Sequence, residues 1–348
     1  MNEIGEDLLR RLAPGTAIRD GLERIRRGRT GALVVLGCDD AVTAICDGGF
    51  DFDVAFSATR LRELCKMDGA VVLSADLTRI RRANTQLLTD PSLPTEESGT
   101  RHRTAERAAL QTGTPVVSVS QSMNIITVYH GGVRHVLQDS AAILSRANQA
   151  LGTIERYRSR LDAGADELFA AELRGVAAAA DAIAVLRVSE LLRRAAGSIG
   201  RDVIALGADG HQLDVQLGEL IADTEYYRRL LVSDYLVTGS GHPEPDQVDA
   251  ALAELAGLDE AELLGSEAVA RTLGFPATLE SLTERVDPRG YRALARVPRL
   301  QYALMDAIVG RFPTLPALLR ADREELAAIE GVGPLWARHV RQGLDRLG

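Results

Sequence analysis

The pattern of apolar residues in this chain of 348 residues changes near residue 141. Before that point, short β-branched runs at 31–37 and 70–76 are separated by a helical stretch at 58–67, which is the alternation of an α/β domain. From about 141 to 240, long stretches of Ala, Leu, Arg and Glu carry hardly any strand signal. We therefore expect a multidomain chain, α/β and then all-α, with an α/β domain at 1–140, a helical spacer at 141–284 and a last helical unit at 285–348.

Composition indicates a globular protein. Hydrophobic residues make up 46% of the chain and charged residues 26%, a balance that separates it from disordered and fibrous chains. No apolar run reaches the length of about 18 residues that spans a bilayer, and residues 1–31 lack a secretory core. We therefore expect a cytoplasmic protein with no membrane partner. Cys38, Cys46 and Cys65 form no CxxC pair and lie in or beside apolar stretches, which predicts reduced core residues.

The first domain is expected to close as a mixed sheet near residue 140. Thr16 is placed to cap a helix, and Gly113 is placed to end one. The Gly131-Gly132 pair between two strand-like runs is typical of a hairpin. The elements expected are helices at 5–28, interrupted at 13–15, and at 100–112, followed by strands at 115–121, 125–130 and 133–138.

The first chemical signal is the turn Asp68-Gly69-Ala70, which lies between a predicted helix and a predicted strand. Gly69 permits unusual backbone dihedrals and close approach of a ligand. Asp68 can hold a divalent metal ion or accept a proton from a sugar hydroxyl. Taken alone, the tripeptide favours a plain Asp-Gly turn over a ligand site.

The second signal is the segment Gly99 to Thr104, which places two Arg, one His and two Thr at the start of a predicted helix. A helix N-terminus already favours an anion, because its first N–H groups lack partners and the helix dipole is positive there. Guanidinium groups add bidentate phosphate contacts, and the hydroxyls of Thr100 and Thr104 add donors. The pattern favours a phosphate-binding segment over an exposed basic turn without a ligand. A triphosphate is the ligand that fits it.

These two motifs and the strand VSVSQS, in this order, resemble the diadenylate cyclase family over residues 7–145. The segment 83–107 is similar throughout to the branch of that family that also carries a DNA-binding module. The resemblance implies an ATP site in which Leu87 lies beside the base and residues 100–104 surround the phosphates. The implied ATP contacts are Asp68, Gly69, Ala70, Leu87, Thr100, Arg101, His102, Arg103, Thr104 and Ser120.

The reaction implied by the resemblance joins two ATP molecules into cyclic di-AMP and releases two pyrophosphates. Asp68 would hold Mg²⁺ or Mn²⁺ and help to deprotonate a 3′-hydroxyl, while Arg101, His102 and Arg103 would steady the phosphate charge. In the branch without a DNA module a Glu on the last strand helps to hold metal, but this chain has Gln121 in the equivalent place. Asp68 and the ATP phosphates are therefore the expected metal ligands.

An oligomer is also expected. The product is two-fold symmetric and the motif set occurs once in the chain, so two subunits must present their ATP molecules face to face. The resemblance implies that this homo-oligomer is an octamer.

The C-terminal region carries the signals of a DNA partner. From Arg285 onward, eleven Arg stand against seven acids, a balance of +4 in a chain of net charge −9. The stretch 326–344 looks like a helix-hairpin-helix, whose tight turn can bind a DNA phosphate without reading sequence. A degenerate first hairpin is expected at 296–312, with Gln301 where a Pro is common in the family, and a loop at 239–246. The expected DNA contacts are Gly331, Val332, Gly333, Arg338 and Arg341.

Two other functions are compatible with parts of this pattern. The first is a non-catalytic DNA-damage scaffold that binds ATP as a structural or sensing ligand, although the intact motifs argue against lost catalysis. The second is an ATPase linked to DNA repair, but the chain has no GxxxxGK[ST] motif and its single lysine is Lys66. Under the cyclase hypothesis, branched or junction DNA is expected to bind the hairpins and inhibit the enzyme.

Overall fold

The computed structural model describes residues 4–239 and 242–347. The chain divides into two compact units. The first runs to Gln149 and includes Ile199–Val215, and the second comprises Ala150–Ser198 and the chain from Gln216 onward.

The first unit contains a mixed sheet, as the sequence predicts. Its strand order is β2-β5-β4-β1-β6-β7-β8, and β3 pairs with the outer side of β5. Strands β1 and β4 are parallel, whereas the other pairs are antiparallel. The strands are β1 (Ala32–Val35), β2 (Cys46–Asp47), β3 (Phe50–Ala55), β4 (Ala70–Leu73), β5 (Arg79–Leu87), β6 (Val116–Val119), β7 (Ile126–His130) and β8 (Val133–Leu137).

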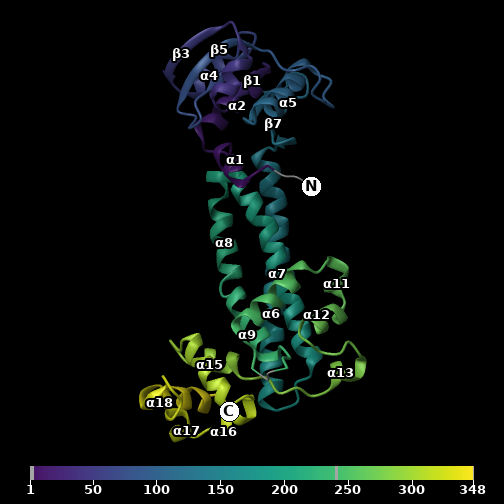
Figure 1. Cartoon of the computed structure of the whole chain (residues 1–348), viewed down its shortest axis with the longest axis vertical. Helices are drawn as coiled ribbons and strands as arrows, with labels where there is room; N and C mark the ends of the chain where they lie inside the picture. The colour runs from purple at the N-terminus through teal and green to yellow at the C-terminus, as the bar shows by residue number, and fades with distance from the viewer. Residues whose placement is uncertain (1–3, 240–241, 348) are drawn as a thin grey trace. The chain divides into compact units, whose positions relative to one another are not determined.

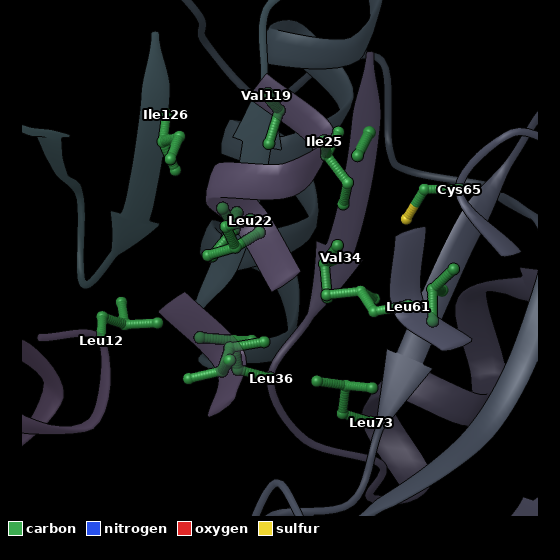
Figure 2. Close-up of a cluster of buried hydrophobic side chains, with 14 of the residues drawn as sticks. Leu12, Leu22, Ile25, Val34, Leu36, Leu61, Cys65, Leu73, Val119 and Ile126 are labelled. Atoms are coloured by element: carbon green, nitrogen blue, oxygen red, sulfur yellow. The ribbon is translucent and has the colours of Figure 1, made fainter. Parts of the chain in front are cut away.

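Helices cover both faces of the sheet centre, which is why β1, β4 and β6 are buried throughout and apolar except for Ser118. Alternate residues of β1 point to opposite faces: Val34 packs under α2 and α4, and Val35 packs under α3 and α5. Figure 2 shows the first of these layers, with Leu22 and Ile25 of α2 beside Val34 and Leu61. The helices of this unit's first part are α1 (Glu6–Arg11), α2 (Ala17–Arg27), α3 (Asp40–Ile45), α4 (Ala58–Leu64) and α5 (Thr100–Thr112).

The helix signals in the sequence are confirmed at their ends. The Thr16 hydroxyl accepts a hydrogen bond from Arg19 N at the start of α2. Helix α5 begins at Thr100 and ends before Gly113, which has φ 69°. Strands β7 and β8 form the expected hairpin over Gly131-Gly132.

Three strands and one cysteine differ from the sequence predictions. Strands β2, β3 and β5 were not expected: β2 has only two residues, and β5 carries three Arg and pairs with β4 through register shifts that break simple alternation. The alternating sequence of β3, FDFDVA, is a strand signal that could have revealed its strand. All three cysteines are free, but Cys38 is exposed, so it is not a core residue; Cys46 is half-buried and Cys65 is buried.

Helices dominate the chain after residue 140, as the sequence predicts (Figure 1). They are α6 (Ser140–Leu173), α7 (Ala179–Leu206), a 3₁₀ turn (Gly207–Gly210), α8 (His211–Ile221), α9 (Thr224–Tyr235), α10 (Pro245–Gly257), α11 (Glu260–Leu264), α12 (Ser266–Thr272), α13 (Leu279–Thr283), α14 (Tyr291–Ala295), α15 (Tyr302–Arg311), α16 (Leu315–Arg320), α17 (Arg323–Ala327) and α18 (Gly333–Asp345). Within the expected loop at 239–246, residues 240 and 241 lie outside the described residues, and the last two residues belong to α10. No described helix is long and apolar enough to cross a membrane.

A buried ionic cluster fixes α14 within the second unit. Arg292 of α14 pairs with Glu172 of α6 and with Asp234 of α9, and all three side chains are buried. Asp234 Oδ1 also accepts hydrogen bonds from Gly290 N (2.8 Å) and Tyr291 N (2.7 Å), which caps α14. A buried charge is tolerated only when it is paired and hydrogen-bonded in this way. The helix that precedes the first expected hairpin is therefore held rigidly.

Candidate nucleotide site and DNA interface

The start of α5 is open to an anion. Its N-cap is Gly99, which supplies no side-chain capping bond, and its first turn contains no acid. The first N–H groups of the helix therefore lack a partner from their own cap. Arg101 and Arg103 are exposed beside them, and Arg103 makes only long hydrogen bonds of 3.4 Å to the carbonyls of Glu97 and Ser98. Both guanidinium groups can turn to a phosphate at little cost.

Asp68 faces this helix start. Its carboxylate is fully exposed, and Oδ1 lies 3.7 Å from Arg101 Nη2. The backbone beside it is held against β5: Gly69 has φ 93°, a Cβ there would lie 2.7 Å from Thr85 O, and Asn84 Nδ2 donates to Asp68 O at 2.7 Å. Only glycine fits this position, because of both its dihedral and its close approach. The two motifs that the sequence singles out are thus brought together.

The sheet register explains how the other predicted residues reach this edge. Val34 pairs with Val71 in parallel, so Gly31 and Gly69 precede neighbouring strands at the same edge. Ala32 pairs with Val119 and Ala70 pairs with Thr85 in antiparallel fashion, so Ser120 and Leu87 end their strands at that edge too. Leu87 and Ser120 are buried, and Ser120 Oγ accepts a hydrogen bond from Met123 N at 3.2 Å. Gln121 is exposed in the turn that follows.

Gly31 belongs to the site although sequence reasoning missed it. A Cβ at this position would lie 2.9 Å from Arg101 Cζ, so the absence of a side chain makes room for the guanidinium beside Asp68. Thr100 is exposed at the first helical position and Thr104 is half-buried one turn later. No local signal distinguishes Gly31 from other glycines that precede a strand, because its role depends on a residue 70 positions away.

His102 faces away from solvent and joins a buried hydrogen-bonded chain. Tyr129 Oη donates to Glu97 Oε1 at 2.6 Å, and Arg134 Nε donates to the same oxygen at 2.6 Å. His102 Nδ1 lies 2.9 Å from Tyr129 Oη. Because the Tyr129 proton goes to the carboxylate, Nδ1 must be the donor in this bond, and Nε2 is left as an unprotonated acceptor. Nε2 is buried without a partner among the described residues.

The hydrogen-bonded chain bears on the charge of His102. Burial lowers the pKa of His102 and outweighs the opposing attraction of Glu97, so the imidazole is neutral at pH 7. Arg101 and Arg103 are therefore the cations at the start of α5, while the contact of His102 with the phosphates stays a prediction. Sequence reasoning missed Glu97 and Tyr129, because the first precedes the helix and the second lies on β7.

The second expected hairpin, between α17 and α18, has the predicted tight turn. Gly331 and Gly333 have φ of 83° and 62°, whereas Val332 between them is buried as an anchor. Arg338 is exposed on the first half of α18. Arg341 is committed elsewhere, because Nη1 donates to Leu319 O (2.9 Å) and Ala321 O (2.8 Å) at the end of α16. A DNA phosphate would have to compete with these bonds, and the phosphate contact of Arg341 stays a prediction.

The first expected hairpin, between α14 and α15, has a comparable form. Arg299 adopts φ 63° in its turn, and Gln301 is the N-cap of α15 without a side-chain capping bond. Val297 is buried beside Gly343 of α18, where a Cβ would lie 2.6 Å from Val297 Cγ2. The two hairpins therefore pack together, and Arg299, which sequence reasoning did not select, is exposed in the first turn.

Comparison with known proteins agrees with this architecture. Residues 19–134 match the family model described as DisA bacterial checkpoint controller nucleotide-binding, and residues 137–282 match the DisA bacterial checkpoint controller linker region. The DNA integrity scanning protein DisA of Corynebacterium glutamicum is 55% identical over 97% of this chain and 92% of its own length. The protein of the same name from a Parafrankia species is 54% identical over 99% of this chain and 96% of its own length. The chain therefore belongs to the DisA family, whose nucleotide-binding domain is a diadenylate cyclase.

Proposed function

We propose that this chain condenses two ATP molecules into cyclic di-AMP at the sheet edge that Asp68 and Arg101 share. The observation that supports this proposal is that the exposed Asp68 carboxylate lies close to Arg101, beside the start of α5, which has no side-chain cap. Each 3′-oxygen attacks the α-phosphorus of the other nucleotide, the bond from that phosphorus to the leaving oxygen breaks, and pyrophosphate departs. Asp68 accepts the hydroxyl proton, and Arg101, Arg103 and the helix N–H groups balance the phosphate charge.

A divalent ion fits the donor set at this edge. The described residues contain no group of three or more His, Cys, Asp or Glu that could hold a metal ion. One exposed carboxylate together with substrate phosphates and water is the usual environment of Mg²⁺ in phosphoryl transfer, and Mn²⁺ accepts the same ligands. The bound ion would supply charge neutralisation on the phosphates. Asp68 would hold it, while Gln121, a neutral amide, would not be required.

The site is completed by a second subunit. One edge carries one set of motifs, and the symmetric product needs two nucleotides placed face to face, so catalysis occurs between subunits of a homo-oligomer. The octamer that the family resemblance implies accommodates such pairs. Incubation of the purified protein with ATP and either Mg²⁺ or Mn²⁺ tests the activity. Cyclic di-AMP is the expected product, whereas ADP or unchanged ATP would favour the ATPase or the non-catalytic scaffold.

In this scheme His102 contacts the nucleotide through Nε2, and Glu97 and Tyr129 are positioning residues that fix the tautomer of its ring. Replacing Tyr129 with Phe leaves the Nδ1 proton of His102 without its acceptor, so the ring tautomer is no longer fixed. We expect kcat to fall by about 10-fold, as for other outer-shell partners of a histidine, while the KM for ATP changes little. Ring ¹⁵N shifts should show Nδ1 protonated in the parent and mixed tautomers in the variant. Tyr157→Phe in the second unit is the matched control, and unchanged kcat and tautomer in Y129F would contradict the role.

DNA is proposed to bind the two packed hairpins through its phosphates and to inhibit the cyclase. The uncapped start of α18, the glycine turn and the exposed Arg299 and Arg338 form a sequence-independent phosphate surface, which suits branched or junction DNA. The chain passes between the two units within α6, α7 and α8, so a shift in the second unit can alter how subunits present ATP.

Charge reversal at Arg338 tests this coupling. In Arg338→Glu we expect junction DNA to bind more weakly, with the salt slope of log K reduced by about one, because one phosphate contact is lost. Inhibition of cyclic di-AMP formation should weaken in parallel, while the rate without DNA is unchanged. Arg346→Glu, at the far end of the same helix, should behave as the parent. If both variants were inhibited equally, DNA would be acting elsewhere, for example by sequestering metal.

A further inference from the structure

A cavity of about 380 Å³ lies within the second unit between α6, α9 and α14. Three aromatic side chains line it: Phe169 of α6, and Tyr226 and Tyr227 of α9. Arg296, just after α14, places its guanidinium 3.9 Å from the centre of the Phe169 ring. A recess of about 120 Å³ continues the cavity past Tyr227. Rings and a stacked guanidinium together form a platform for a flat, π-bonded ligand.

Two polar groups in this cavity have unused hydrogen-bonding capacity. Thr224 is 3% exposed and lines the recess, yet its Oγ1 has no hydrogen-bond partner among the described residues. Leaving such a buried hydroxyl unpaired is unfavourable, so it indicates a missing ligand group. Asp223 lines both spaces, adopts φ 60° and makes no capping bond to α9, so its carboxylate can accept N–H donors.

Arg292 also lines the cavity but does not belong to this set. Its charge is balanced by Glu172 and Asp234, and Nη1 donates to Tyr227 Oη at 3.4 Å, which fixes the wall. Arg296, by contrast, has a half-exposed side chain and only a 4.0 Å ion pair with Asp166. The cavity thus offers aromatic faces, a carboxylate for N–H groups, a hydroxyl and one cation at its rim. A nucleobase with an attached phosphate presents the complementary groups, because its ring stacks and its amino or imino groups donate.

The position of the cavity identifies the source of that base. Arg296 immediately precedes the turn of the first hairpin, where Val297 is buried and Arg299 is exposed. A DNA phosphate bound at Arg299 is therefore held three residues along the chain from Arg296 at the cavity rim. We propose that the cavity takes up an unpaired nucleobase of branched DNA bound at the hairpins, an inference that rests on the proposed DNA binding. It gives a physical reason why a branch point would be preferred to a continuous duplex, in which every base is stacked and paired.

The test uses the full chain and a three-way junction with one unpaired 2-aminopurine at the branch point. Binding should quench its fluorescence, because the base stacks on tyrosine. Tyr226 is the residue to change, since it is 44% exposed and its hydrogen bond to the Met305 sulfur is long, at 3.9 Å. In Tyr226→Ala we expect the quenching to be lost and this junction to bind about 5- to 150-fold more weakly, the range for one base stacked on one ring. Tyr157→Ala, which removes a half-buried tyrosine outside the cavity, is the matched control.

The outcomes separate this proposal from the one on which it rests. Equal quenching and affinity in the parent and Y226A would overturn the nucleobase site while leaving DNA binding intact. If the parent protein bound no junction at the salt concentration used in the Arg338→Glu experiment, both the nucleobase site and the proposed DNA binding would be overturned. Loss of quenching on addition of ATP or cyclic di-AMP, with the DNA still bound, would assign the cavity to a free nucleotide instead. A thermal unfolding midpoint equal to that of the parent checks that each variant is folded.

Discussion

Replacing Asp68 with Asn is expected to lower the rate of cyclic di-AMP formation by about 10³-fold while ATP still binds. The amide cannot accept the 3′-hydroxyl proton, and it is a much weaker ligand for a divalent ion than a carboxylate. The Asp68 side chain is fully exposed and contacts Arg101 at 3.7 Å, so its replacement removes no packing. The loss should therefore appear in kcat rather than in stability.

The measurement separates turnover from binding. Product formation is followed by chromatography, and ATP affinity is measured by calorimetry on the same preparation. Asp40→Asn is a matched control, because Asp40 is an exposed acid of the same unit in the first turn of α3. D68N turnover within a few-fold of the parent would remove Asp68 from the chemistry, whereas loss of ATP binding alone would give it a purely structural role at the Gly69 turn.

Replacing Arg101 and Arg103 together with Ala is expected to weaken ATP binding by about 10²- to 10⁴-fold. Each charge-assisted contact to phosphate contributes about 1.5–3 kcal/mol, and tenfold in affinity corresponds to about 1.4 kcal/mol. Neither side chain is required by the fold, since Arg103 makes only 3.4 Å bonds and Arg101 pairs with an exposed carboxylate. The protein should therefore fold normally.

The effect of the pair is not expected to equal the sum of the single changes. Removing Arg101 also leaves Asp68 without its ion-pair partner beside the phosphates, so Arg101→Ala alone should cost more than Arg103→Ala. Arg10 and Arg24, which are exposed on α1 and α2 and engaged only in surface ion pairs, provide the double-Ala control. Unchanged ATP affinity in the R101A/R103A protein would place the triphosphate away from α5.

The sequence predicted those features that depend on neighbours along the chain. The cap at Thr16, the start of α5 at Thr100 and the Gly131-Gly132 hairpin each follow from a few adjacent residues, and the structure confirms them. The Asp68 and Arg101 motifs were recognisable because their residue types and order are distinctive. The strand β5 was not predicted from the sequence. Its three arginines interrupt the apolar residues, and its irregular pairing with β4 breaks the alternation of buried and exposed side chains.

The tertiary structure alone determines which residues that are distant in sequence come together. Strand register brings Gly31, Asp68 and Ser120 to one sheet edge, and burial beside Tyr129 lowers the pKa of His102. Arg341 resembles a DNA contact in sequence, yet the carbonyls at the end of α16 hold it. Helix caps and turns are determined by local hydrogen bonds and dihedral preferences, so the sequence by itself specifies them. The protonation and partners of a side chain depend on which groups are packed around it, and that environment exists only once the strands have paired and the helices have docked.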